Sequence, residues 1–121
     1  MGRYLKSGSG WRVGWNSEAA EFKGLVGDED WAIELTEFEF REFRRLAEHL
    51  SRTIAQISEE LMNEETIACE AEADAIWLEA EGFPRAFSLR FILRTGRNAE
   101  GFWTAAAVPE LLQALDAIEV F

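Results

Sequence analysis

Residues 36–62, TEFEFREFRRLAEHLSRTIAQISEELM, hold the longest unbroken helical pattern in the chain. Thr36 followed by Glu39 has the spacing of a capping box, which marks the first turn of a helix. Behind it, apolar residues recur at alternating spacings of three and four and so share one stripe of a helix. They are Phe40, Phe43, Ala47, Leu50, Ile54, Ile57 and Leu61. We predict one helix from residue 36 to about residue 62, with strands before and after it.

The apolar stripe can be covered in two ways. Its positions repeat every seven residues, as in the seam between two packed helices. A helix on a broad sheet has a wider apolar face, and few apolar residues flank this stripe after Leu46. We therefore keep two interpretations open, a core helix of this chain and the seam of a homodimer. The residues in question are Phe43, Ala47, Leu50, Ile54, Ile57 and Leu61.

Strand patterns stand on both sides of the helix. Before it, the candidate segments are residues 10–16, 22–27 and 31–35. After it, they are residues 67–71, 76–80, 87–93 and 102–105. Pro109 then opens a short closing helix that carries Leu111, Leu112, Leu115 and Ile118. The order predicts an α+β fold of antiparallel meanders, three or four strands and then four, each followed by a helix.

The N-terminal residues lack such a pattern. Residues 1–9 include Ser7, Gly8 and Ser9 and are expected to form a loose lead-in, with a short edge strand at Tyr4 and Leu5 as the alternative. We assign residues 10–121 to one domain.

A register for the second meander follows from its apolar alternation. Placing Leu78 opposite Leu89 keeps the apolar side chains of both strands on one face and leaves residues 82–85 as the turn. Proline is then the third of four turn residues, a position that the cis-proline turn requires. We therefore predict a cis peptide bond between Phe83 and Pro84.

Composition narrows the classes of function. The chain has 121 residues, 48% of them hydrophobic, and a formal net charge of -11. That size suits one globular core, and the charge repels nucleic acid phosphates and acidic membranes while it favours a basic protein partner. The single cysteine, Cys69, cannot form an internal disulfide, so we expect a reducing, cytoplasmic location. No apolar run approaches the roughly 18 residues of a membrane span.

A candidate interaction surface lies on the second meander. Residues 53–84 carry many acids and no Lys or Arg, and Arg85, Arg90, Arg94 and Arg97 follow directly. In the predicted register Glu70, Trp77 and Arg90 form a row across three strands on the outer face. The alternative is a solvated sheet face without a ligand. The predicted surface comprises Glu70, Glu72, Trp77, Glu79, Glu81, Arg90, Arg94 and Arg97.

The sequence offers no set of residues for catalysis, for a metal or for a cofactor. One histidine, His49, cannot build a multi-histidine zinc site, and Cys69 alternates with apolar residues as an inert buried thiol would. The glycines at positions 8, 10 and 14 miss the spacing of a dinucleotide-binding loop. We therefore expect no enzymatic activity and no cofactor.

Several stretches together resemble a family of small acidic cyanobacterial proteins of unknown function. They are GWRVGWN (10–16), GLVGDEDWAIELTE (24–37), ACEAEADAIWLEAEGFP (68–84), SLRFILRTGRNAEG (88–101) and VPELLQAL (108–115). The resemblance covers nearly the whole chain. It implies a fold similar to the single-stranded-DNA-binding transcriptional regulators of the Whirly and coactivator type. It implies no activity, and nothing here matches the Lys-rich KGKAAL-like strand that Whirly proteins present to DNA.

Two functional hypotheses follow from these observations. The first is a non-enzymatic interaction module that presents an acidic sheet face to a protein partner. The second is a single-strand nucleic acid binder or transcription regulator that uses Arg85, Arg90, Arg94 and Arg97 with Trp77. An enzyme with paired carboxylates is a third class, which requires a cleft that a sequence cannot show.

Overall fold

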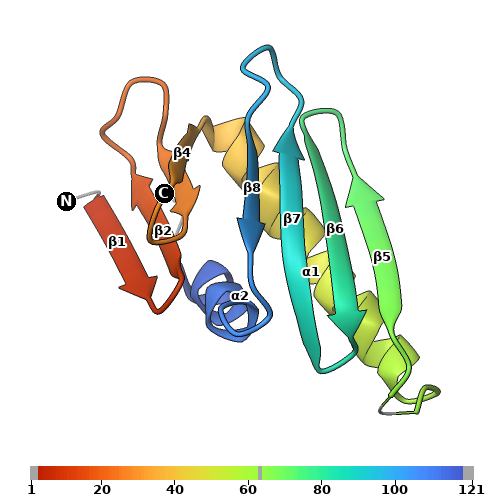
Figure 1. Ribbon diagram of the computed structural model, residues 1–121. Coiled ribbons are helices and arrows are strands. Elements are labelled where there is room, and N and C mark those ends of the chain that lie inside the picture. Colours follow the sequence, from red (N-terminus) through yellow and green to blue (C-terminus); the bar gives the residue numbers. More distant parts are fainter. Residues whose placement is uncertain (1–2, 63, 119–121) are drawn as a thin grey trace.

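Two four-stranded antiparallel sheets and two helices make up the described part of the chain, residues 3–62 and 64–118 of a computed structural model (Figure 1). The first sheet has the order β1-β2-β3-β4, and the second has the order β5-β6-β7-β8. The elements are β1 (Arg3–Gly8), β2 (Trp11–Asn16), β3 (Gly24–Gly27), β4 (Ala32–Leu35), α1 (Glu37–Ser58), β5 (Ile67–Glu72), β6 (Ile76–Phe83), β7 (Ala86–Leu93), β8 (Glu100–Trp103) and α2 (Val108–Ala117). The predicted α+β order, two meanders each followed by a helix, is confirmed.

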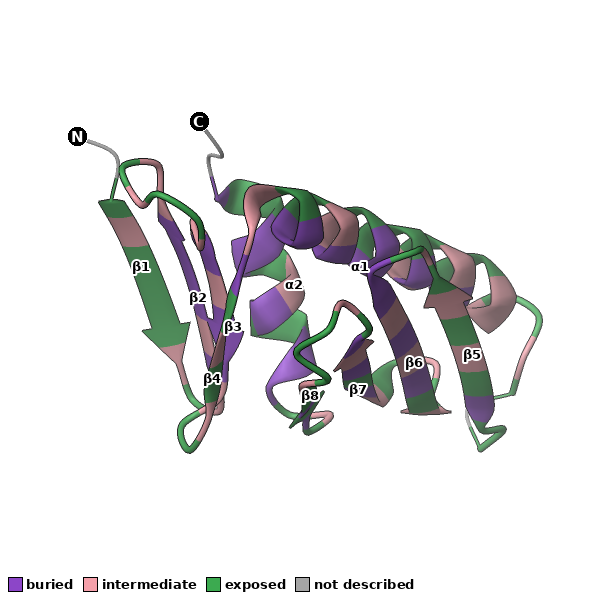
Figure 2. Cartoon of the chain, turned by 90° about the horizontal axis from the view of Figure 1, so that it is seen from above, coloured by how far each residue is buried: buried purple, intermediate pink, exposed green. Residues whose placement is uncertain are grey.

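The two helices lie on the inner side of the sheets. Helix α1 packs against β3 and β4 of the first sheet and against β5 and β6 of the second. Helix α2 contacts β2, β7 and α1. Figure 2 shows α1 running across both sheets with α2 between them, and the buried residues turned toward this interior. The opposite, outer face of each sheet has neither helix on it (Figures 1 and 2).

The N-terminal segment is an ordered strand. Residues 3–8 pair with β2 along the whole of β1, with Leu5 opposite Gly14. The expected loose lead-in is therefore wrong for these residues, and the alternative edge strand is longer than Tyr4 and Leu5. An edge strand is held by main-chain hydrogen bonds to one neighbour, so it does not need the apolar alternation that we looked for.

Helix α1 begins as predicted and ends earlier. The Thr36 hydroxyl accepts a hydrogen bond from the Glu39 amide at 3.2 Å, and the Glu39 carboxylate accepts one from the Thr36 amide at 2.8 Å. The helix ends at Ser58 rather than near Met62. No basic residue stands in its last turn, and Glu59 and Glu60 would extend the helix with acids at its negative pole.

The apolar stripe of α1 packs on the chain's own sheets. Phe43, Ala47, Leu50 and Ile54 are buried within the single chain, whereas Ile57 and Leu61 are partly exposed. Leu46, which we placed outside the stripe, is also buried. The stripe looked narrow because sheets and α2 cover different sides of the helix. The core interpretation therefore holds for these buried residues, and they offer no exposed surface for a second chain.

The register of the second sheet is shifted from our prediction by two residues. Leu78 lies opposite Phe91 rather than Leu89, which leaves every side chain on the predicted face because strand side chains alternate with period two. Phe83 pairs with Ala86, so that the turn is Pro84 and Arg85 alone. No cis peptide bond occurs among the described residues, and the predicted cis bond is wrong because its four-residue turn does not exist.

An aromatic cluster joins the two sheets to α1. Trp103 of β8 lies 5.1 Å from Trp31, 5.6 Å from Phe91 and 5.7 Å from Phe43, measured between ring centroids. The indole nitrogen of Trp103 donates a hydrogen bond of 2.8 Å to the Gly27 carbonyl of the first sheet. The core is therefore continuous between the halves, and it fixes β8 beside the first sheet.

Candidate interaction surface

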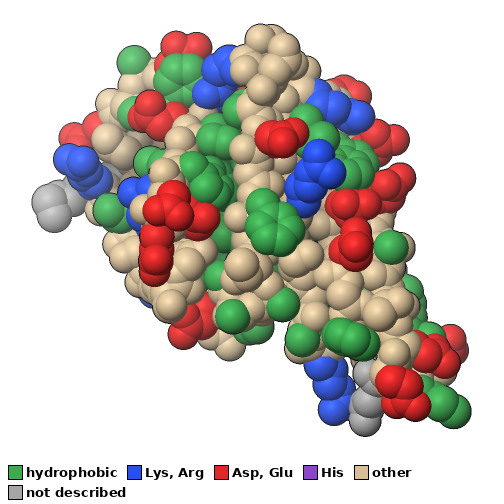
Figure 3. Space-filling model, in the orientation of Figure 1, with side chains coloured by type: hydrophobic (Ala, Val, Ile, Leu, Met, Phe, Trp, Pro, Cys, Tyr) green, Lys and Arg blue, Asp and Glu red, His purple; other side chains and the backbone are tan. Residues whose placement is uncertain are grey.

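The outer face of the second sheet brings most of the predicted surface residues together. Residues two apart along a strand share a face, and the register aligns the outward ones in two rows across the four strands. The first row is Glu72, Trp77, Ile92 and Glu100, and the second is Glu70, Glu79, Arg90 and Phe102. We call these eight residues, with Glu81, the acidic sheet face. Figure 3 shows acidic side chains gathered over β5 and β6, with hydrophobic and basic side chains beside them.

Trp77 and Arg90 lie at the centre of this face. The predicted row of Glu70, Trp77 and Arg90 is wrong, because the shifted register puts Arg90 opposite Glu79 and Trp77 opposite Ile92. Arg90 still reaches Trp77 diagonally, with its guanidinium carbon 5.8 Å from the ring centroid, in the range of a cation–π contact. Its second partner is Glu100, at 3.7 Å.

The carboxylates of the face differ in their partners. Glu72 forms an ion pair of 2.9 Å with Arg94, and Glu100 forms an ion pair of 3.7 Å with Arg90. Glu70, Glu79 and Glu81 have no ion pair within the part of the chain that the structure describes. Glu70 and Glu79 lie directly opposite each other, an arrangement that destabilises a sheet because the charges repel. A cation from another molecule would relieve this repulsion.

The four predicted arginines do not form one basic strip. Arg94 follows β7 and binds the β5–β6 turn, with 2.6 Å from its guanidinium to the Ala73 carbonyl. Arg85 is in the β6–β7 turn, at one end of the sheet. Arg97 lies in the β7–β8 loop and binds Glu39, so it is not part of the acidic sheet face. Only Arg90 stands in the middle of that face.

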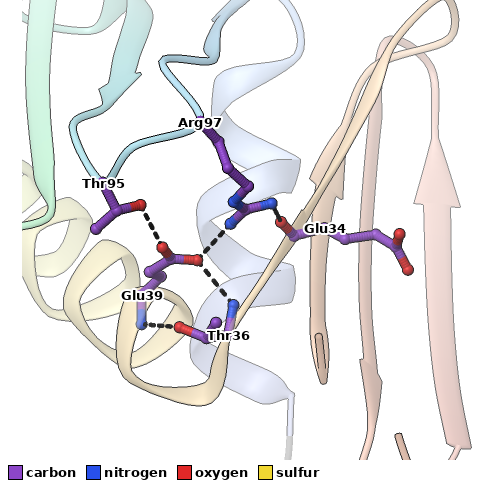
Figure 4. A network of polar contacts seen from close by, with 5 residues as sticks. All are labelled: Glu34, Thr36, Glu39, Thr95 and Arg97. Atoms are coloured by element: carbon purple, nitrogen blue, oxygen red, sulfur yellow. Dashed lines mark hydrogen bonds and ion pairs between the residues drawn. The ribbon is translucent and has the colours of Figure 1, made fainter. Parts of the chain in front are cut away.

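A second polar cluster joins the start of α1 to both sheets (Figure 4). Glu39 is 4% exposed, and its carboxylate accepts hydrogen bonds from the hydroxyl of Thr95 at 2.5 Å and from the guanidinium of Arg97 at 2.5 Å. Arg97 also donates to the Glu34 carbonyl at the end of β4, at 2.6 Å. We call Thr36, Glu39, Thr95 and Arg97 the junction network. It connects β4, α1 and the β7–β8 loop.

The junction network sets the ionisation of Glu39. Burial by itself raises the pKa of this carboxyl, but the Thr95 hydroxyl, the Thr36 amide and the charge of Arg97 together outweigh it and hold the pKa below its ordinary value. Glu39 is therefore an ionised, fully partnered group. Its atoms are occupied by the protein itself, which indicates a structural role rather than a ligand site.

Sequence reasoning found only part of both clusters. The capping box identified the local role of Glu39. Thr95 and Arg97 lie more than fifty residues away, and no local pattern predicts their contacts with Glu39. Ile92, Glu100 and Phe102 were missed on the acidic sheet face. The signal for Ile92 and Phe102 was available, since each alternates with an inward-facing neighbour, Phe91 or Trp103.

The remaining candidates of the sequence lie outside these clusters. His49 is on the exposed side of α1, and Cys69 of β5 is partly exposed and packs against the core. Among the described residues, no group of three or more His, Cys, Asp or Glu side chains is placed to hold a metal ion. No described helix is both long and apolar enough to cross a membrane.

Comparison with known proteins places the chain in a family. Residues 6–118 match the family described as a domain of unknown function, DUF1818. The chain belongs to this family. A crystal structure from Prochlorococcus sp. NATL2A, described as a protein with unknown function from the DUF155 family, is similar with 30% sequence identity and a TM-score of 0.91. The match covers 96% of this chain and 98% of that chain. No curated protein matches the sequence.

These findings confirm the coarser part of the resemblance seen in the sequence. The family is one of unknown function, and the similar solved structure comes from a cyanobacterium. Neither finding names an activity, a ligand or a partner.

Proposed function

We propose that this protein is a non-enzymatic interaction module that binds a basic protein partner through the acidic sheet face. One observation carries the proposal. Glu70, Glu79 and Glu81 have no ion pair within the described chain, and they stand on the same face as the exposed ring of Phe102. The exposed ring supplies apolar area for a partner to cover, and aromatic residues are enriched in protein–protein interfaces.

The two kinds of group on this face would act at different stages of binding. Carboxylates attract a basic partner over distance and orient it, and they raise the association rate more than the final affinity. Aromatic and aliphatic groups such as Trp77, Ile92 and Phe102 supply the affinity when they are covered. The net charge of -11 extends the attraction beyond the face itself.

Single-strand nucleic acid binding is the less favoured alternative. Its support is the contact between Arg90 and Trp77, which resembles a stacking platform for a base. Against it, Arg94 and Arg97 are engaged with Glu72 and Glu39, and the carboxylates around Trp77 repel phosphates. Titration of labelled oligonucleotides at low ionic strength separates the two. Binding below tens of micromolar would replace our proposal with this alternative.

We further propose that the fold is similar to the Whirly and coactivator type and that the protein acts in the cytoplasm. The repeated order of a four-stranded antiparallel meander and a helix supports the first point. A chain with one cysteine, which cannot form an internal disulfide, supports the second. Neither point carries DNA binding to this chain, because a fold does not specify a function.

The proposal is tested by affinity capture from a cyanobacterial lysate with two matched baits. The first bait carries Glu70→Gln, Glu79→Gln and Glu81→Gln. The second carries Glu18→Gln, Glu21→Gln and Asp30→Asn, which are exposed residues that precede α1 and change the net charge equally. We expect a basic protein to be retained by the wild type and by the second bait, and to be lost from the first.

Equal loss from both baits would show that only total charge matters, which contradicts a defined face. Retention of the partner by the first bait would place its binding site elsewhere. Retention of no protein by the wild type under gentle, low-salt conditions would also contradict the proposal.

A further inference from the structure

An apolar groove lies at the C-terminal end of α1, the end opposite the junction network. It has a volume of about 300 Å³ between the C-terminal end of the helix and the β6–β7 turn. Leu61 and Met62 line one side, and Phe83 and Pro84 line the other. Met62 is 66% exposed and Phe83 is exposed too, so two large apolar side chains border a hollow that the described chain leaves open.

Four glutamates adjoin the lining residues along the chain, and we call them the acidic rim. Glu59 and Glu60 come between Ser58 and Leu61 in the sequence, and Glu64 and Glu65 come shortly after Met62, while the lining itself contains none of the four. All four are exposed, and none forms an ion pair with a described residue. The first two also lie at the negative pole of the helix dipole, where the last turn supplies no basic residue. No ion pair among the described residues compensates this charge, and Arg85 is the only cation among the described residues that line the groove.

We propose that this groove binds a cationic amphipathic segment of a protein partner. One apolar side chain of the segment would enter between Met62 and Phe83. Lys or Arg residues on either side of it would meet the glutamates of the rim and the carbonyl end of α1. The combination of an apolar floor and an uncompensated acidic rim selects for this occupant, since neither a purely basic nor a purely apolar segment satisfies both.

The same charges argue against the other occupants. In a two-fold dimer through this groove, each rim would face its own copy, and the glutamates of the two chains would repel one another. An anionic membrane would meet the same repulsion, because membrane-binding surfaces are rich in Lys and Arg. A basic amphipathic segment is the one occupant that the charge of the rim attracts.

The test uses a fluorescently labelled synthetic peptide of alternating Leu-Leu and Lys-Lys pairs, with a second peptide in which Ser replaces every Leu. Anisotropy titrations at low ionic strength measure both. We expect the Leu peptide to bind at least about tenfold more tightly than the Ser peptide, because only the former can bury apolar surface in the groove. Equal affinities, or binding of neither peptide, would overturn the proposal.

Matched variants locate the site. Met62→Ser with Phe83→Ser removes the walls of the groove, and Leu5→Ser removes another side chain that is 66% exposed, on β1. Phe102→Ser reports binding to the acidic sheet face. We expect about tenfold weaker binding for the groove variant, unchanged binding for Leu5→Ser, and a smaller loss for Phe102→Ser than for the groove variant. Weakening by Phe102→Ser with an unaffected groove variant would assign the peptide to the sheet face and reject the groove.

Two further measurements apply to the wild-type chain and need no variant. Amide chemical shifts of a labelled protein should change on peptide addition for residues 58–62, 83, 85 and 86, and changes confined to other residues would reject the groove. Sedimentation should show that the chain does not associate through this site. A wild-type dimer that Met62→Ser dissociates would make a second copy the occupant and overturn the peptide proposal.

Discussion

The junction network and the acidic sheet face contain the same kinds of charged group in opposite states. At the junction, Glu39 is buried and its two carboxylate oxygens are bound by Thr36, Thr95 and Arg97. On the face, Glu70, Glu79 and Glu81 have no ion pair within the described chain. The comparison separates a carboxylate that the fold uses from carboxylates that the fold leaves available. Acidic composition alone does not make this distinction.

Neighbouring residues of β8 show the same contrast for aromatic groups. Trp103 is 1% exposed at the centre of the aromatic cluster, whereas Phe102 is 49% exposed on the acidic sheet face. Trp103→Ala should lower the free energy of unfolding by about 3–5 kcal/mol, because it leaves a large cavity between the sheets and α1. Phe102→Ala should lower it by less than about 1 kcal/mol. Denaturant titration measures both, and equal losses would contradict the assignment of the two faces.

The second prediction compares two glutamates. Glu39→Gln should lower the free energy of unfolding by about 2–3 kcal/mol, because it leaves Arg97 without its charged partner and disturbs the start of α1. Glu79→Gln keeps a similar shape at a partly exposed strand position, where the carboxylate has no ion pair with a described residue, and should leave stability nearly unchanged. The measurement is again the denaturation midpoint. A Glu79 variant as destabilised as the Glu39 variant would show that the face is also a structural element.

The pH dependence of stability tests the ionisation of Glu39 separately. The pKa of Glu39 is lower in the folded than in the unfolded chain, so the unfolded state binds more protons on acidification. The contribution of Glu39 to the free energy of unfolding is therefore fully present above its unfolded pKa of about 4.3. The contribution is lost as the pH falls through the lower folded value. The stability difference between wild type and Glu39→Gln should therefore be constant near pH 7 and shrink below about pH 4. A difference that grows on acidification would contradict this direction.

The smallest expected effect concerns the repulsion on the face. Glu70→Gln removes one of two carboxylates that lie directly opposite each other, and it should stabilise the chain by about 0.3 kcal/mol at low ionic strength. Added salt should abolish the gain, because exposed charges are screened. The matched change Glu72→Gln removes an ion pair with Arg94 and should not stabilise. A stabilising Glu72 variant would show that general charge reduction, rather than this pair, is responsible.

Sequence patterns predicted the elements of this fold better than their contacts. Period two placed Leu78 and Leu89 on one face correctly, but it cannot detect a shift of two residues, so the pairing of Leu78 with Phe91 was missed. Helical periodicity found the stripe of α1 and could not tell a sheet from a second helix as its cover. The length of strand β1 was underestimated because main-chain pairing with β2 does not require an alternating side-chain pattern.

The sequence predicted most of the residues on the candidate surface, but the structure changed which of them are neighbours and removed Arg97 from it. Charge alternation identified Glu70, Glu79 and Trp77 as outward residues, which needs only the local period of a strand. The removal of Arg97 from the face depends on the β7–β8 loop folding back to α1, a contact between residues 58 positions apart. Such contacts are set by the packing of the sheets around the aromatic cluster, which no local pattern encodes.

Zero-length cross-linking of the chain to its captured basic partner tests the central claim most directly. A carbodiimide couples a carboxylate to a lysine only where the two are in contact, and mass spectrometry identifies the linked residues. The account predicts cross-links from Glu70, Glu79 or Glu81 to lysines of the partner, and none from Glu18 or Glu21. Cross-links confined to those last two residues, or to other acids away from the outer face of the second sheet, would contradict it.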